Sequence, residues 1–174
     1  AGWLAAVEPV RQVDVVELEP EVVSAARRCH AATRNVLENP KVSLVIGDAR
    51  EWVLTTKRSY DLIVSEPSNP YRAGVASLYS REFYQASARV LRPGGIFAQW
   101  VQGYEVSLPT LATICATLRT VFPHVQVWCA SGGDLVFLAS ATPAWPGDTA
   151  VRAALAREPM KSALARIAHA EGLE

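Results

Sequence analysis

The 174-residue sequence has no apolar run that approaches the ~20 residues of a membrane-spanning helix. Its first residues, AGWLAAVEPVRQ, lack the basic region of a signal peptide, so none is predicted. The sequence also lacks an excess of either charge, because 17 basic residues balance 17 acidic ones. The chain therefore lacks the basic field that drives nonspecific nucleic-acid binding, and no nucleic-acid partner is expected.

Cysteine is scarce as well. Cys29, Cys115 and Cys129 are far apart and form no CxxC pair. This spacing argues against a disulfide framework and against a zinc site, so no metal is expected. It is typical of small buried thiols in a reducing compartment, which predicts a cytoplasmic location. The three histidines are isolated in the sequence, and surface or capping roles are favoured for them.

Strand-like and helix-like segments alternate along the chain. We predict strands at 13–19, 41–48, 60–66 and 96–102, helices at 20–35, 50–56, 80–91 and 107–122, and a final hairpin around Ser131–Gly133. Such alternation implies an α/β, Rossmann-like, doubly wound and mostly parallel sheet. The C-terminal hairpin should add an antiparallel edge strand. Residues 1–140 form the predicted domain, and 141–174 are a linker and a helical tail interrupted at Pro159.

An acidic residue stands at the end of each of the first three predicted strands: Glu17, Asp48 and Glu66. Ligands of doubly wound sheets bind beyond these ends, where a carboxylate can accept hydrogen bonds from ribose hydroxyls or an amine. Structural roles are the alternative. Glu17 or Glu19 could favour a helix N-terminus, Asp48 could cap the next helix, and Glu66 could be a solvated loop acid.

Four blocks together resemble one family: VDVVELEPEVV, NPKVSLVIGDAREWV, YDLIVSEPSNP and SREFYQASARVLRPGG. They are similar to the spermidine/spermine synthase (aminopropyltransferase) family on the class I methyltransferase-like fold. The likeness runs from Val13 to Ser140. It is greatest to divergent members that are fused to, or encoded with, membrane-transporter-like segments. A membrane segment in the parent protein, with this chain as its cytoplasmic domain, is therefore one expected arrangement.

The resemblance implies transfer of an aminopropyl group from decarboxylated S-adenosylmethionine to a polyamine such as putrescine, with no metal. It implies that Glu17 binds the ribose diol and that Asp48 and Ala49 bind the adenine. Glu66 falls where the family has its catalytic Asp, and Asn69 falls where it has a second Asp. Tyr71 and Tyr79 flank this loop as candidates to cover substrate, and Trp100 is a candidate to line the amine pocket.

Two departures from the family pattern are visible. The family's Asp-Ser-Ser/Thr-Asp-Pro is replaced by Glu-Pro-Ser-Asn-Pro, and Asn69 carries no negative charge. The first strand and Gly-rich cofactor loop, expected before AGWLAAVEP, are missing. That strand would lie between the strands at 13–19 and 60–66, so its absence predicts two unpaired edges. We therefore expect an N-terminally truncated, inactive fragment that binds nucleotide poorly. Two ways of closing the sheet stay open, a rearrangement of the strands or self-association into a homo-oligomer.

Two other functions stay open. Ordinary methyl transfer from S-adenosylmethionine would use the same fold and the same strand ends. A non-catalytic nucleotide-sensing or interaction domain would retain the fold without the reaction, and the uncharged Asn69 favours this third hypothesis.

Overall fold

The computed structural model describes residues 1–143 and 145–171. These residues form two compact units. The first contains Ala1–Ala49 and the described residues from Trp145 onward, and the second runs from Arg50 to residue 143.

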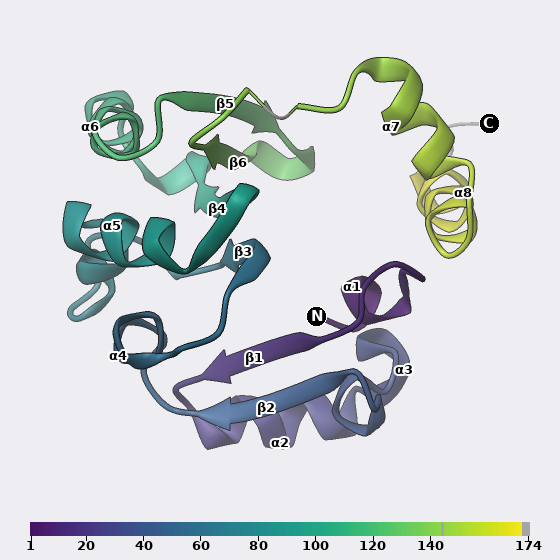
Figure 1. The fold of residues 1–174 in the computed structure, drawn as a ribbon. Helices are drawn as coiled ribbons and strands as arrows, with labels where there is room; N and C mark the ends of the chain where they lie inside the picture. The colour runs from purple at the N-terminus through teal and green to yellow at the C-terminus, as the bar shows by residue number, and fades with distance from the viewer. Residues whose placement is uncertain (144, 172–174) are drawn as a thin grey trace. The chain divides into compact units, whose positions relative to one another are not determined.

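The first unit is built around a pair of parallel strands (Figure 1). Strand β1 pairs with β2 from Val13 beside Val42 to Glu17 beside Ile46. The unit contains α1 (Gly2–Ala6), β1 (Val13–Glu17), α2 (Pro20–Arg28), α3 (His30–Thr33), β2 (Val42–Ile46), α7 (Asp148–Leu155) and α8 (Met160–Glu171). The two helical pieces predicted for the tail are confirmed.

Helix α2 begins and ends where local chemistry favours it. Pro20 occupies the first turn, and Arg27 and Arg28 lie in the last turn, where positive charge complements the helix dipole. The prediction of one helix over 20–35 is wrong, because the helix is interrupted at Cys29. Farther on, Arg34 and the next residue adopt left-handed backbone angles, with φ of 56° and 51°, which ends helical geometry.

The second unit contains a four-stranded sheet in the order β3-β4-β6-β5. Strands β3 and β4 are parallel, and β6 is antiparallel to both of its neighbours. The predicted C-terminal antiparallel hairpin is confirmed: β5 pairs antiparallel with β6 and forms the edge, while β6 joins the hairpin to β4. The elements are α4 (Ala49–Thr55), β3 (Tyr60–Ser65), α5 (Arg81–Val90), β4 (Leu91–Gln102), α6 (Leu108–Arg119), β5 (His124–Cys129) and β6 (Asp134–Ser140).

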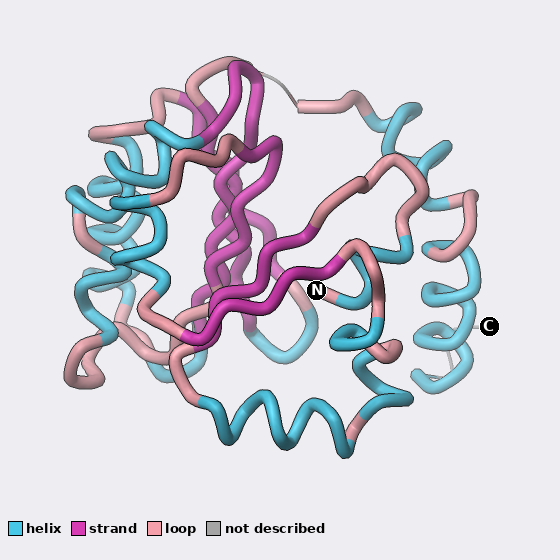
Figure 2. Tube along the Cα trace, turned by 60° about the horizontal axis from the view of Figure 1, so that its bottom comes forward, coloured by secondary structure: helices cyan, strands magenta, loops and turns pink. Residues whose placement is uncertain are grey.

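Helices α5 and α6 pack on one face of this sheet, where the main core lies (Figure 2). The rings of Phe83 and Tyr84 on α5 contact Phe97 on β4 with centroid separations of 6.1 and 5.6 Å. Phe122, which follows α6, stacks on Phe97 at 5.7 Å. Every member of this main core cluster belongs to the second unit, so most apolar stabilisation of the chain is concentrated there.

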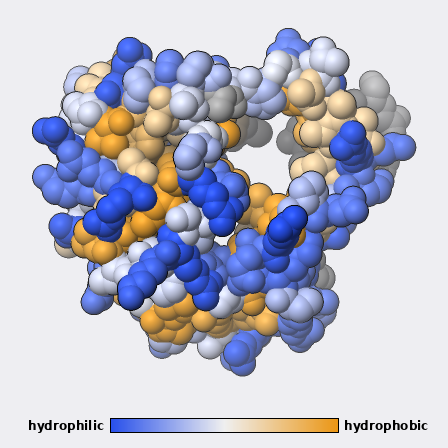
Figure 3. All heavy atoms as spheres, viewed as in Figure 1, coloured by the Kyte–Doolittle hydropathy of each residue, from blue (hydrophilic) through white to orange (hydrophobic). Residues whose placement is uncertain are grey.

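As predicted, β1 and β3 each have an edge with which no described strand pairs. On β3, the side chains of Leu62 and Val64 are 40% and 44% exposed. Apolar residues also reach the surface elsewhere, as patches in Figure 3. Self-association through these edges remains a prediction.

Two predictions about burial are wrong. Cys29 and Cys129 are exposed. Trp128 lies on a predicted strand, for which core packing is the default expectation, but it is 57% exposed. Cys129 and Trp128 lie at the end of β5, which has a sheet neighbour on only one side. In the part of the chain that the structure describes, none of the helices combines the length and apolar character needed to cross a membrane.

Candidate functional site

The loop after β3 presents an exposed carboxylate on a partly buried backbone. Glu66 directly follows Ser65, the last residue of β3, and its side chain is exposed. The next residue, Pro67, is buried, and Asn69 is only 3% exposed. The loop is thus held on the protein while the Glu66 carboxylate reaches solvent, where a ligand can meet it.

Asn69 has a different environment from Glu66. Its side-chain amide donates a hydrogen bond to the phenol oxygen of Tyr71. Its backbone carbonyl accepts from the Arg72 amide at 3.0 Å, and the Arg72 carbonyl accepts from the Val75 amide at 3.1 Å. These successive turns make the loop compact. The two residues predicted to be catalytic therefore lie on one loop, one exposed and one buried.

A buried polar network lies behind this loop. The Tyr79 phenol donates to the Ser68 carbonyl at 3.0 Å. The Tyr84 phenol donates to Oε1 of Gln99 at 2.7 Å, and Nε2 of Gln99 donates to the Leu78 carbonyl at 3.3 Å. Burial raises the pKa of Tyr79 to about 12. Burial, and then the charge of Tyr79, raise the pKa of Tyr84. Both phenols therefore stay protonated, and able to donate these hydrogen bonds, to a higher pH than an ordinary tyrosine.

Sequence reasoning missed this network, although one signal for it was present. Gln99 is the one polar residue within the apolar run of β4 from Ile96 to Val101, and it is fully buried. A buried amide requires hydrogen-bond partners. Tyr84 falls on the apolar, inward-facing pattern of the helix predicted at 80–91, and it was therefore a candidate partner. The prediction that Tyr79 covers substrate is wrong, because Tyr79 is 8% exposed and belongs to the core.

Tyr71 and Trp100, the other two candidates, remain accessible to different degrees. Tyr71 is 64% exposed beside the loop. Trp100 is half-buried on β4 and adjoins Gln99, so its side chain lies on the opposite face of the sheet. Whether either contacts a ligand stays a prediction.

The predicted nucleoside-binding residues lie in or at the boundary of the first unit. The pairing of Glu17 with Ile46 places the acids Glu17 and Asp48 at the same carboxyl end of the β1–β2 pair. Asp48 is exposed, and Ala49 begins α4. Oε1 of Glu17 accepts a hydrogen bond from the Glu19 amide at 3.0 Å, which orients the carboxylate.

These observations describe two groups of residues, each within its own unit. Glu17 and Asp48 share one sheet end of the first unit, and Glu66 and Asn69 share one loop of the second. Among the described residues, no group of three or more His, Cys, Asp or Glu side chains could hold a metal ion.

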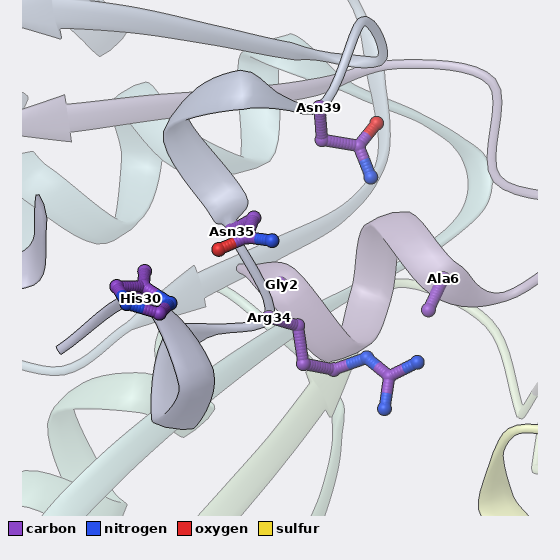
Figure 4. A pocket seen from close by; sticks show the side chains of 6 residues that line it. All are labelled: Gly2, Ala6, His30, Arg34, Asn35 and Asn39. Carbon is purple, nitrogen blue, oxygen red and sulfur yellow. The ribbon is translucent and has the colours of Figure 1, made fainter.

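A polar pocket of about 350 Å³ lies elsewhere in the first unit (Figure 4). Its lining residues are Gly2, Ala6, His30, Arg34, Asn35 and Asn39. None of them is a predicted site residue. The two groups of strand-end residues described above, each within its own unit, are therefore kept as the candidate binding residues.

Comparison with known proteins identifies the family. A model of the spermine/spermidine synthase domain matches residues 4–131, which is more than half of the chain. This chain belongs to the spermine/spermidine synthase family. The match includes the three strand-end acids and the whole loop from Glu66 to Tyr79.

Two curated relatives represent two activities. A polyamine aminopropyltransferase of Nitrosomonas europaea is 33% identical over 118 residues, covering 67% of this chain and 36% of the relative. Putrescine N-methyltransferase 4 of Nicotiana tabacum is 29% identical over 114 residues, covering 65% of this chain and 29% of the relative. The chain thus spans about a third of the length of these relatives.

Two solved structures show the same fold. A spermidine synthase in complex with the transition-state analogue AdoDATO has a TM-score of 0.70 at 22% identity, covering 78% of this chain and 48% of that one. Human methyltransferase-like protein 13 in complex with SAH has a TM-score of 0.67 at 18% identity, covering 86% and 70%. The predicted methyltransferase-like α/β fold is confirmed.

Proposed function

We propose that the whole protein transfers an aminopropyl group from decarboxylated S-adenosylmethionine to an amine. The observation that carries this proposal is the exposed carboxylate of Glu66, which directly follows β3 on a loop held by buried Pro67 and Asn69. A carboxylate that solvent and ligand can reach, on a backbone held in place, can accept the proton that a protonated amine must lose. The family to which the chain belongs supports the assignment.

The proposed reaction needs a base because a protonated amine has no lone pair. Glu66 accepts the proton from the ammonium, and the neutral nitrogen attacks the carbon bonded to the sulfonium sulfur. The new C–N bond forms as the C–S bond breaks, and the bonding electron pair stays on sulfur. Methylthioadenosine leaves, and the aminopropyl group is now on the acceptor. The short, compact loop limits the positions of the carboxylate, which favours a productive approach.

We infer that the nucleoside binds at the ends of β1 and β2. Glu17 accepts from the ribose hydroxyls, and Asp48 with Ala49 contacts the adenine. The register that places both acids at one sheet end supports this inference, as does the exposure of Asp48. Vicinal hydroxyls can both donate to one carboxylate, which is the chemistry that Glu17 offers.

The acceptor is inferred to be held by one carboxylate and not by two. Asn69 has no charge, is buried, and donates its amide to Tyr71. A second ammonium of a diamine such as putrescine therefore gains no ion pair from Asn69. We expect weaker binding of the diamine than a site with two acids would give.

Methyl transfer from S-adenosylmethionine is the second candidate. It is favoured by the relatedness to putrescine N-methyltransferase 4. The two reactions give different products, methylthioadenosine from aminopropyl transfer and S-adenosylhomocysteine from methyl transfer. Chromatography of the nucleoside product distinguishes them directly.

The test is a comparison of Glu66→Gln with the wild type, using putrescine and each nucleoside donor in the whole natural protein. Glutamine retains the shape of the side chain but cannot accept the proton, so kcat should fall by about 10² or more. The matched control is Glu82→Gln, since Glu82 is an exposed acid on α5. It should retain the wild-type rate.

The outcomes are separable. Loss of turnover in Glu66→Gln, with full turnover in Glu82→Gln, supports the assignment of the base. Turnover that survives Glu66→Gln contradicts it. Absence of turnover in the wild type with both donors contradicts transfer altogether and leaves the nucleotide-sensing alternative. Calorimetric titration of methylthioadenosine into wild type and Glu17→Ala then tests nucleoside binding separately.

A further inference from the structure

A core tyrosine is attached to the loop that carries Glu66. The phenol of Tyr79 donates a hydrogen bond to the Ser68 carbonyl at 3.0 Å, across 11 positions in the sequence. The Tyr79 side chain is 8% exposed and belongs to the main core cluster. The donor of this hydrogen bond, the Tyr79 phenol, is therefore fixed by core packing, and the acceptor is a backbone carbonyl of the loop.

Ser68 and Glu66 are close in the sequence, and the backbone between them is stiff. Only Pro67 separates the two residues, and its ring fixes the backbone angle φ. Pro67 is itself buried. A displacement of the Ser68 carbonyl therefore changes the position of Glu66, because few backbone torsions lie between them.

Tyr79 is supported in turn by the strand beside β3. Nε2 of Gln99 donates to the carbonyl of Leu78, the residue before Tyr79. The Tyr84 phenol holds the other end of the Gln99 amide. Gln99 also pairs in register with Ser65, the residue before Glu66. Both ends of the loop are thus tied to the same position on β4.

We infer that Tyr79 is a positioning residue, which sets the location of the Glu66 carboxylate through the Ser68 carbonyl. This inference rests on the proposed function of Glu66. Tyr79 lies beneath the loop and acts on its backbone, so it need not contact substrate. Its hydroxyl is the group that matters, because the ring alone would fill the core.

The test is Tyr79→Phe in the whole protein, with Tyr60→Phe as the matched control. Tyr60 lies at the opposite end of β3, and its phenol oxygen accepts a hydrogen bond from Nε1 of Trp52 at 3.0 Å. We expect Tyr79→Phe to lower kcat by about 10- to 100-fold, because small displacements of a catalytic group are costly. The affinity for the nucleoside donor should be unchanged. Tyr60→Phe should retain kcat within about twofold.

A second readout makes the inference testable without turnover. Hydrogen exchange should show faster exchange in the loop from Glu66 to Arg72 in Tyr79→Phe, by about tenfold, with β4 and β6 unchanged. Faster loop exchange together with normal kcat would overturn the positioning role. Unchanged loop exchange would overturn the anchor itself. If the wild type has no transferase activity, the proposed function fails, and the exchange result alone decides whether Tyr79 holds the loop.

Discussion

At the scale of single residues, burial decides what chemically similar side chains do. Tyr71 lies within the loop from Glu66 to Tyr79, and Tyr79 ends it, yet Tyr71 is 64% exposed and Tyr79 is 8% exposed. The Tyr71 side chain is accessible to a ligand, whereas the Tyr79 side chain lies in the core and donates a hydrogen bond to the loop backbone. Glu66 and Asn69 differ in the same way. The candidate chemistry therefore depends on which side of a short loop each side chain occupies.

The buried Tyr79 phenol predicts a dependence of stability on alkaline pH. Its pKa in the folded protein, about 12, lies above the ordinary value of 10.0. The folded state thus holds this proton more strongly than the unfolded state. The stabilisation is complete below pH 10 and is lost as the pH rises towards 12. The free energy of unfolding should fall across this window more steeply in the wild type than in Tyr79→Phe.

Urea denaturation of the two proteins at a series of alkaline pH values checks this prediction. Both proteins retain the same lysines and arginines, so the difference between them reports the Tyr79 phenol together with its charge effect on Tyr84. Parallel stability curves from pH 10 to 12 would contradict the assigned burial of the phenol.

At the scale of elements, α5 connects the candidate loop to the core. Its N-cap, Ser80, follows Tyr79 directly, and Ser80 Oγ accepts a hydrogen bond from the Phe83 amide at 3.3 Å. The helix then buries Phe83 and Tyr84 against the sheet. The start of this helix therefore fixes both the loop end and the aromatic core.

Replacing the cap should destabilise the chain. We expect Ser80→Ala to lower the free energy of unfolding by about 1 kcal/mol, because the Phe83 amide loses its acceptor. The control is Thr113→Ala on α6, where the hydroxyl donates to the Pro109 carbonyl and caps no amide. That variant should be near neutral, since alanine favours helix. Equal loss in both variants, measured by urea denaturation, would contradict the capping role.

At the scale of the whole molecule, apolar burial is unequal between the two units. The main core cluster lies between Val53 and Ala139, within the second unit. In the first unit, the buried apolar residues among those described are Ala5, Val23 and Val36. Since buried apolar area is the main favourable contribution to folding, the first unit should be the less stable.

Hydrogen exchange of this chain should reveal that difference. We expect the amides of β1 and β2 to exchange at least about a hundredfold faster than those of β4 and β6, because local opening requires less free energy where little apolar surface is buried. The same experiment contains its own control, since all four strands form ladder hydrogen bonds. Uniform protection of both units would contradict the prediction and indicate one cooperative unit.

Several elements were predictable because their signals are local. The continuous apolar run from Leu62 to Val64 indicated β3. Ser80, a typical N-cap residue before an apolar helical pattern, indicated the start of α5. Pro159 separated the two tail helices. The interruption at Cys29, where α2 ends, was not predictable, because the apolar spacing continues through this residue. The left-handed backbone at Arg34 was not predictable either, because no glycine, the residue that usually adopts it, stands there.

By itself, the sequence determined the family, the α/β class, and the acids that follow successive strands, because residue order and periodicity record these features directly. The tertiary structure alone decided that β6 lies between β4 and β5, and that Tyr79 and Gln99 are buried beneath the loop. The physical reason is that strand pairing and the burial of a polar side chain depend on partners distant in the sequence. Tyr79 and Ser68 illustrate this: neither residue indicates a partner until the loop between them closes.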